Sequence, residues 1–376
     1  MKVLKFGGTS VGSVESIRNV KNILASREGK KVLVLSAMAG ITNKLVEITE
    51  LIKSEDNLAI ANIIAELKEK HENTIDSLIN EPELNIQAKN FVSNVLNNLK
   101  EVCKSNYSER VYAEVVTTGE TMLTYIFSTF LTNSGIQNNF LDAKEFMQVS
   151  NLENPDTNLV GKLFQKSIEN LKASEIYITQ GFVRIDAQHS ISTLKRGGSD
   201  YSATILAAAV QAEEVQIWTD IDGFHNNDPR YVENTHAIAE LSFEEASELA
   251  YFGAKILHPQ TISPVIKKQI PLFLKNTFTP DLPGTRISAE IHSRGLKAIS
   301  AKDGITAIKI KSNRMLMAHG FLKKIFEVFD KYETAIDMIT TSEIAISLTI
   351  DDDRNLNEIL EELNDYGEIT VEKEHS

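Results

Sequence analysis

The chain has 376 residues, of which 42% are hydrophobic and 24% are charged, and these values exclude a disordered or fibrous protein. A chain of this length predicts two domains, one large and one small. Its formal net charge of −13 disfavours a surface for nucleic acid or for an anionic membrane, because such surfaces rely on clustered lysine and arginine.

Two units of strand, turn and helix open the chain. Residues 2–6 predict a strand, which is followed by two glycines and then by an amphipathic helix over residues 14–24. Residues 31–35 predict a second strand, which ends in the small-residue loop 36–40 before helical periodicity resumes. Two such units in succession predict a parallel sheet.

The middle of the chain continues this alternation after a long helical region. Residues 41–118 contain no glycine and show apolar residues at helical spacing, so we expect several helices there. Further strands are expected near residues 140–141 and over 175–179, 191–194, 215–218 and 271–274, with helices over 201–210 and 243–251. We place the end of this first domain at residue 295.

The remaining residues predict a small α+β module. Its expected elements are strands over 306–310, 335–340, 344–350 and 368–371, with helices over 320–329 and 356–363. This order is βαββαβ.

Features that would direct the chain out of the cytoplasm are not found in the sequence. The N-terminal segment lacks the apolar core of a signal peptide, and no uncharged run of about 18 apolar residues occurs. Cys103 is the only cysteine, which excludes an intrachain disulfide or a cysteine-based zinc site. We therefore expect a cytoplasmic protein that does not enter a membrane.

The first glycine pair follows a lysine at the end of a predicted strand. Gly7 and Gly8 let backbone N–H groups approach phosphate oxygens, and Lys5 would neutralise the charge of a transferring phosphoryl group. The alternative is a tight turn with a solvated lysine. The segment is not a Walker A loop, because no Gly-Lys-Ser/Thr follows.

A second loop repeats this design with an arginine. Arg196 precedes Gly197 and Gly198 and is suited to bidentate binding of a carboxylate. Ser199 and Asp200 follow at the start of a predicted helix, where Asp200 can also be only a helix cap. The two roles are compatible.

Other candidate ligand-binding residues lie where a predicted strand ends or a predicted helix begins. Thr219 and Asp220 come directly after a strand, at the edge where open α/β sheets bind ligands, although aspartate-rich turns are often only turns. Glu120 stands at a predicted helix start, where either the helix dipole or a substrate ammonium would explain it. No metal site is predicted from protein side chains alone. We expect Mg²⁺ to arrive with ATP. His258 is expected to be structural, and none of the eight histidines has a spacing typical of zinc sites.

Taken together and in this order, the motifs resemble those of the aspartate kinases. The matching segments are Lys5-Phe6-Gly7-Gly8-Thr9-Ser10, residues 36–43, Gly119-Glu120, residues 197–200, Trp218-Thr219-Asp220, Asp228-Pro229-Arg230 and residues 252–259. The resemblance covers essentially the whole chain. It implies an α/β amino-acid-kinase domain over residues 1–295, an αβα sandwich with a mainly parallel sheet, followed by an ACT-like βαββαβ module within residues 296–376.

The same resemblance implies phosphorylation of the β-carboxylate of L-aspartate by ATP, giving 4-phospho-L-aspartate and ADP. This is the first step of the pathway to lysine, threonine and methionine. The implied catalytic residues are Lys5 and Asp200, and the implied substrate-binding residues are Ser36, Thr42, Glu120, Arg196 and Ser199. The implied nucleotide-binding residues are Lys5, Gly7, Gly8, Thr219, Asp220, His225, Arg230 and Lys255. His225 stands where many relatives carry a tyrosine against the base.

For the tail, the resemblance implies an amino-acid effector site. In lysine-sensitive relatives the effector pocket matches Met315, Gly320, Phe321, Leu322, Asp337, Thr341, Ser342 and Glu343. Met317 stands where some relatives have histidine, so lysine and threonine both stay open as effectors. ACT modules pair side by side, which implies a homodimer.

The resemblance also implies that the regulatory half is incomplete. Residues 296–301 are expected to form a single strand of a second ACT module whose remaining elements do not follow. We expect this strand to pack on the kinase domain or a partner, or the chain to be a truncated form, with lysine inhibition weak or absent unless one module suffices.

Two alternatives remain from the residues. One is a kinase of another acidic amino acid, of the glutamate 5-kinase or acetylglutamate kinase type, which Glu120 and the ACT-like tail argue against. The other is an amino-acid sensor that has lost catalysis, which the combination of Lys5, Arg196 and Asp200 argues against.

Overall fold

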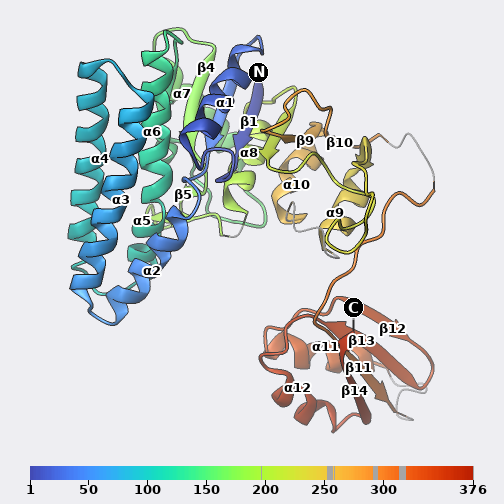
Figure 1. Ribbon diagram of the computed structural model, residues 1–376. Helices are drawn as coiled ribbons and strands as arrows, with labels where there is room; N and C mark the ends of the chain where they lie inside the picture. The colour runs from blue at the N-terminus through green and yellow to red at the C-terminus, as the bar shows by residue number, and fades with distance from the viewer. Residues whose placement is uncertain (196, 252–256, 258, 291–294, 313–318, 376) are drawn as a thin grey trace. The chain divides into compact units, whose positions relative to one another are not determined.

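The chain folds into two compact units, residues 1–299 and 300–376 (Figure 1). The structure is a computed structural model, and it describes residues 1–195, 197–251, 257, 259–290, 295–312 and 319–375. Each unit has its own sheet and its own hydrophobic core.

The first unit is built on an eight-stranded sheet in the order β3-β4-β2-β1-β7-β9-β10-β8. Neighbouring strands are parallel except for the antiparallel pair β9 and β10, so the predicted mainly parallel sheet is confirmed. The strands are β1 (Lys2–Phe6), β2 (Lys31–Leu35), β3 (Asn139–Leu141), β4 (Ile176–Gln180), β7 (Val215–Thr219), β8 (Glu240–Ser242), β9 (Leu272–Asn276) and β10 (Thr285–Ser288).

Helices cover both faces of this sheet (Figure 1). All five residues of β2 are buried, and alternate ones belong to two different cores, because successive side chains of a strand point to opposite faces. The core on one face is shared with six helices, α1 (Val14–Ala25), α2 (Ile41–Lys53), α3 (Asn57–Leu78), α4 (Pro82–Val102), α5 (Glu109–Val116) and α6 (Thr118–Asn133). The core on the other face is shared with α7 (Thr157–Ile168), α8 (Gly198–Ala209), α9 (Phe243–Tyr251) and α10 (Pro259–Lys268).

The glycine-free region forms α2 to α5 and the start of α6, as its periodicity predicted. The strand expected over 191–194 is β6 (Ile191–Thr193), but it pairs with β5 (Val183–Ile185) in a separate hairpin. The strands β5, β8 and β10 were not predicted. They span only three or four residues, too few for an alternating pattern to stand out.

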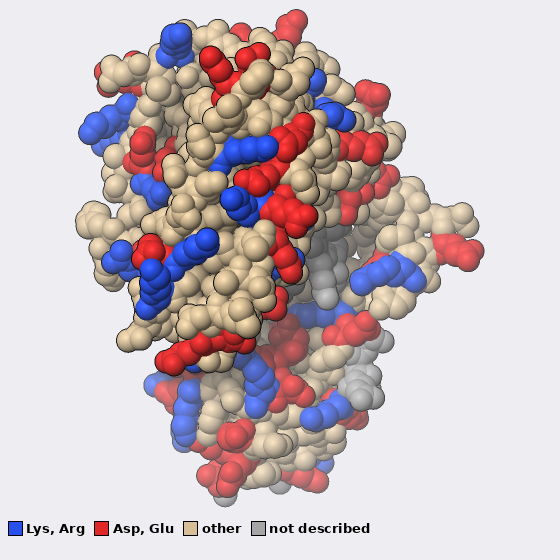
Figure 2. Space-filling model, turned by 60° about the vertical axis from the view of Figure 1, so that its left-hand side comes forward, with Lys and Arg blue, Asp and Glu red and all other residues tan. Residues whose placement is uncertain are grey.

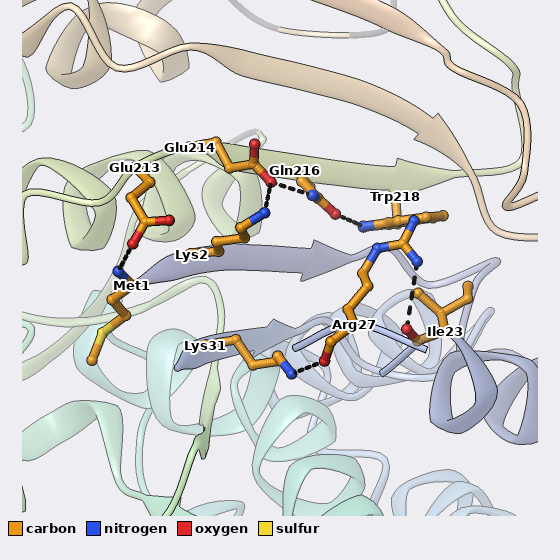
Figure 3. Close-up of polar contacts among 9 residues, drawn as sticks. All are labelled: Met1, Lys2, Ile23, Arg27, Lys31, Glu213, Glu214, Gln216 and Trp218. Carbon is orange, nitrogen blue, oxygen red and sulfur yellow. Dashed lines mark hydrogen bonds and ion pairs between the residues drawn. The ribbon is translucent and has the colours of Figure 1, made fainter. Parts of the chain in front are cut away.

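A polar network connects the starts of β2 and β7 and extends along β7 to Trp218 (Figure 3). The guanidinium of Arg27 lies 4.8 Å from the ring centroid of Trp218, whose indole N–H donates to Gln216. Gln216 in turn donates to Glu214, while the buried amine of Lys31 donates to the carbonyl of Arg27. Burial lowers the pKa of both Arg27 and Lys31, and nearby carboxylates partly offset this shift. These contacts fix the starts of β2 and β7.

The second unit has the predicted βαββαβ order. Its elements are β11 (Ile305–Lys311), α11 (Phe321–Lys331), β12 (Met338–Thr341), β13 (Ala345–Ile350), α12 (Leu356–Leu363) and β14 (Glu368–His375). The four strands form an antiparallel sheet in the order β12-β13-β11-β14. Both helices pack on this sheet through one core, which includes Ile308, Ile325, Phe329, Leu348 and Ile359.

The strand predicted over residues 296–301 is not formed, so that prediction is wrong. Leu296 is 85% exposed and Ile299 is 60% exposed. The segment is held by single contacts: the N–H of Ile299 donates to the carbonyl of Asn226, and Lys297 pairs with Glu245 at 2.8 Å. A strand needs a row of backbone partners along a sheet edge. Residues 296–301 pair with none of the strands that the structure describes.

Charges of both signs are mixed over the face drawn in Figure 2. Ion pairs join different helices of the first unit, for example Lys89 with Asp76 at 2.6 Å. Within the described part of the chain, no helix is both long and apolar enough to cross a membrane.

Candidate active site

Those residues predicted for phosphoryl transfer and substrate binding that the structure describes meet in one pocket of about 400 Å³ in the first unit. The pocket lies at the C-terminal ends of β1 and β2, where the loops leading into α2 and α8 come together with the start of α6. It is lined by the predicted residues Lys5, Gly8, Ser36, Thr42, Glu120, Ser199 and Asp200, together with Ala37, Met38, Ala39, Gly40, Asn43, Phe182, Lys195, Gly197 and Gly198.

Lys5 and Asp200 form an ion pair inside this pocket. The Nζ of Lys5 lies 2.7 Å from Oδ1 of Asp200, and the two side chains are 11% and 15% exposed. Their orientation does not meet the angles of a hydrogen bond. Lys5 lies on strand β1, which pairs with β2 and β7. Asp200 lies in the first turn of α8. The pair therefore joins the first glycine loop to the second.

The first glycine loop is tied to the end of β7. The N–H of Gly7 donates to the carbonyl of Trp218 at 3.1 Å, and the hydroxyl of Ser10 donates to the same oxygen at 3.2 Å. A methyl group on Gly8 would lie 3.2 Å from the carbonyl oxygen of Ala37 in the neighbouring loop. This close approach leaves little room for a side chain at Gly8.

Glu120 is an acidic residue buried at the wall of the pocket. It is 3% exposed, and its Oε2 has no hydrogen-bond partner among the described residues. Burial raises the pKa of Glu120 to about 7, although hydrogen bonds from its own backbone and that of Ala37 act in the opposite direction. A carboxylate left unpaired in this way is suited to receive a cation from a ligand.

The second glycine loop brings α8 against the end of β4. Gly197 precedes α8 in the left-handed conformation, with φ of +69°, which a glycine adopts without strain. A methyl group on Gly181 would lie 2.6 Å from Cβ of Ser199. Any larger residue at Gly181 must displace the first turn of α8.

We therefore expect Gly181→Ala to lower kcat/KM about 10- to 100-fold, because Ser199 and Asp200 would move with that turn. Gly161→Ala is the matched control, since a methyl group there would lie 2.6 Å from the carbonyl of Ala209, at the other end of α8. Both variants should lose about 1–3 kcal/mol of stability in denaturant unfolding. Only Gly181→Ala should change the kinetics. Normal kinetics in that variant would show that Gly181 does not set the positions of Ser199 and Asp200.

The predicted nucleotide residues after β7 do not line this pocket. Thr219 and Asp220 stand at the end of β7, where the hydroxyl of Thr219 donates to Asp220 at 2.9 Å. Because Trp218 pairs with Phe6 in the sheet, this end lies beside the first glycine loop. Arg230 is two-thirds exposed and pairs with Asp228 at 2.6 Å.

His225 lies further along the same segment and is already engaged within the chain. Its Nε2 lies 2.6 Å from Oδ1 of Asp222, and its Nδ1 lies 2.8 Å from the hydroxyl of Thr235. Of the other predicted residues, Arg196, Lys255, His258 and Met315 lie outside the described residues.

The predicted effector residues of the second unit that the structure describes lie in three places. Gly320 precedes α11, with Phe321 buried and Leu322 exposed at its start. Thr341 ends β12, and the turn that follows contains Ser342 and Glu343; the N–H of Ser342 donates to Ala345 at 2.8 Å. Asp337 precedes β12 at the opposite end of that strand, where Lys302 lies 3.6 Å away.

Two lining residues lie outside the segments that resemble the aspartate kinases and were not predicted, Phe182 and Lys195. Both have a backbone in the left-handed region, with φ of +70° and +59°, which no sequence signal indicated. A larger cavity of about 760 Å³ is lined by residues of α4, α5, α6 and the segment before β6, and it contains none of the predicted site residues.

The fold and the two glycine loops around one pocket define the class of protein, a small-molecule kinase. The family model described as "Amino acid kinase family" matches residues 1–276. The lysine-sensitive aspartokinase 3 of Escherichia coli K12 is 33% identical over 359 residues, which are 93% of this chain and 78% of that relative. This chain belongs to the aspartokinases of the amino acid kinase family.

Solved structures agree with this membership. Two structures of E. coli aspartokinase III match with a TM-score of 0.78 and 31% identity, and the match covers 99% of this chain and 85% of each of those chains. One is a complex with aspartate and ADP, described as the R-state, and the other is a complex with lysine and aspartate, described as the T-state.

Proposed function

We propose that this chain transfers the γ-phosphoryl group of ATP to the β-carboxylate of L-aspartate, giving 4-phospho-L-aspartate and ADP. The observation that carries this proposal is the Lys5–Asp200 ion pair in the same pocket as the buried, unpaired Glu120. Such a pocket offers a fixed cation for a phosphoryl group and an anion for an ammonium group.

In this reaction the substrate carboxylate is the nucleophile. It is ionised at pH 7, so no strong general base is needed. Catalysis then consists of holding two anions close together and cancelling the charge that develops. Lys5 stabilises that charge, and Asp200 holds the amine of Lys5 in place.

The aspartate is held by groups around the acceptor position. Glu120 pairs with the α-ammonium group, and Arg196 pairs with the α-carboxylate. Ser36, Thr42 and Ser199 provide hydroxyl groups for the remaining oxygens. These assignments are supported by the fact that Glu120, Ser36, Thr42 and Ser199 line the same pocket. Arg196 lies outside the described residues.

The nucleotide is held beside the first glycine loop. Gly7 and Gly8 line the phosphates, while Thr219, Asp220, His225, Arg230 and Lys255 hold the nucleoside. The described residues contain no group of three or more histidine, cysteine, aspartate or glutamate side chains arranged for a metal ion. We infer that Mg²⁺ enters with ATP, where it neutralises phosphate charge.

A coupled assay for ADP release tests this function against its alternatives. We expect ADP release with L-aspartate and little with L-glutamate or without an acceptor. Preference for glutamate would identify a different acidic amino-acid kinase, and no release with either acceptor would identify a sensor without catalysis.

We propose that the second unit is an ACT regulatory module and that the protein acts in the cytoplasm as a homodimer formed through this module. Gly320, Leu322 and the turn from Thr341 to Glu343 are the proposed effector contacts. The lysine sensitivity in the name of the E. coli relative supports lysine over threonine as the effector.

The resemblance implied weak or absent lysine inhibition unless one ACT module suffices. Because the second unit has the full βαββαβ order and its own core, we infer that one module does suffice. Lysine is then expected to inhibit aspartate phosphorylation with a midpoint at or below about 1 mM, the scale of ordinary small-molecule affinities. Glu343→Gln should weaken this inhibition without changing kcat in the absence of lysine, and Glu333→Gln, outside the proposed contacts, is the control. Inhibition by threonine alone, or by neither amino acid, would contradict the assignment. Sedimentation analysis with and without lysine tests the dimer.

A further inference from the structure

The loop that leads into α8 holds a lysine in an unfavourable backbone conformation. Lys195 has φ of +59°, in the left-handed region where a residue with a Cβ is strained and glycine is favoured. Both sides of the residue are anchored: the N–H of Leu194 donates to Phe182 at 2.9 Å, and the N–H of Gly198 donates to the carbonyl of Lys195 at 3.1 Å. The backbone is therefore held in place whatever the side chain.

This strain is found at the edge of the substrate pocket. Such strained residues cluster at functional sites, where the side chain serves a purpose that the unstrained residue would not. Glycine at this position would remove the strain. The side chain of Lys195 is therefore expected to have a function that glycine could not provide. That side chain is exposed and lines the pocket.

The amine of Lys195 is available to a ligand. It forms no ion pair or hydrogen bond with any residue that the structure describes, whereas the amine of Lys5 is paired with Asp200 at 2.7 Å. The only other charged residue among the described lining residues is Glu120. Lys195 is thus the unpaired cation among them.

The charge balance of the pocket gives this cation a role. With Glu120 ionised, the described lining residues carry two negative and two positive charges, so that without Lys195 these residues would have a net negative charge. The whole chain has a formal net charge of −13, which has the same sign. A cation at the mouth of a site raises the local concentration of an anionic substrate.

We infer that Lys195 is a binding residue for the dicarboxylate acceptor, with its amine pairing with a carboxylate of that substrate. This inference rests on the proposed function. The acceptor is favoured over the nucleoside because the pocket that Lys195 lines contains Ser36, Thr42 and Glu120, whereas Thr219 and Arg230, which are proposed to hold the nucleoside, do not line it.

The test compares Lys195→Met, which keeps length but removes charge, with Lys195→Arg, which keeps charge. At low salt, Lys195→Met should raise the KM for L-aspartate about 5- to 20-fold, with kcat and the KM for ATP changed less than 2-fold. Lys195→Arg should stay within about 3-fold of the original KM. Added NaCl should raise the KM of the original protein more steeply than that of Lys195→Met, because salt screens the lost interaction.

Lys195→Gly separates charge from strain. It should raise the KM for aspartate as Lys195→Met does, and it should also raise the melting temperature because the strain is relieved. Gln211→Gly is the matched control, since exposed Gln211 has φ of +50° at the end of α8 and does not line the pocket. It should raise the melting temperature and leave both KM values unchanged.

An unchanged KM for aspartate in Lys195→Met would overturn the inference. So would an effect that falls equally on ATP, or on kcat alone. If the original protein releases no ADP with aspartate, the proposed function itself fails, whereas normal aspartate kinetics in Lys195→Met would refute only the role of Lys195.

Discussion

Replacing Lys5 with methionine is expected to lower kcat about 10²- to 10³-fold, with much smaller changes in the KM for either substrate. Removing one preorganised charge from a transition state typically has an effect of this size. Lys5 is held by β1 and paired with Asp200 at 2.7 Å, so its amine is in position before the substrates arrive. The measurement is steady-state ADP release with saturating aspartate and ATP.

The control for this variant is Lys53→Met, which removes an exposed lysine of α2 whose partner is Glu50. It should keep the original kinetics. Asp200→Asn should lower kcat as well, and the double variant should lose less than the product of the two single effects, because the pair acts as a unit. Near-normal turnover in Lys5→Met would refute the proposed mechanism.

The second large effect is expected at Glu120. Glu120→Gln keeps the shape of the side chain but removes its charge, so the KM for aspartate should rise about 10- to 100-fold while the KM for ATP stays within about 2-fold. The original protein should bind aspartate more tightly as pH rises through about 7, because the carboxyl group ionises over that range. The Gln variant should lack this pH dependence, and equal losses for both substrates would contradict the pairing with the ammonium group.

The same residue predicts a pH effect on stability without ligand. The pKa of Glu120 is about 7 in the folded chain against 4.5 for the exposed group, so the folded state binds more protons between these values. The free energy of unfolding should therefore fall as pH rises through this range, by an amount on the order of 3 kcal/mol. Glu120→Gln should melt at a higher temperature than the original protein at pH 8 and at nearly the same temperature at pH 4.5. Equal melting temperatures of the original protein and Glu120→Gln at pH 8 would show that the buried charge of Glu120 does not destabilise the fold.

The sequence by itself determined most of the element order and much of the pocket. The starts of β1 and β2 and their glycine or small-residue loops are local features, because apolar runs and glycine turns depend on neighbouring residues. Lys5, Glu120, Ser199 and Asp200 could therefore be singled out from local patterns, whereas Ser36 and Thr42 were implied only by the resemblance to the aspartate kinases. All six line one pocket. The parallel sheet then brings these separate loops to a common edge.

Other features were decided only by the tertiary structure. The apolar residues 296–301 resemble a strand, but a strand exists only where another backbone edge accepts its hydrogen bonds, and none does so here. The raised pKa of Glu120 comes from burial among helices distant in sequence. The left-handed backbone of Lys195 follows Leu194, whose N–H donates to Phe182 on a segment that only the fold brings near. In each case the deciding contact is non-local, so the residue's neighbours in the chain do not encode it.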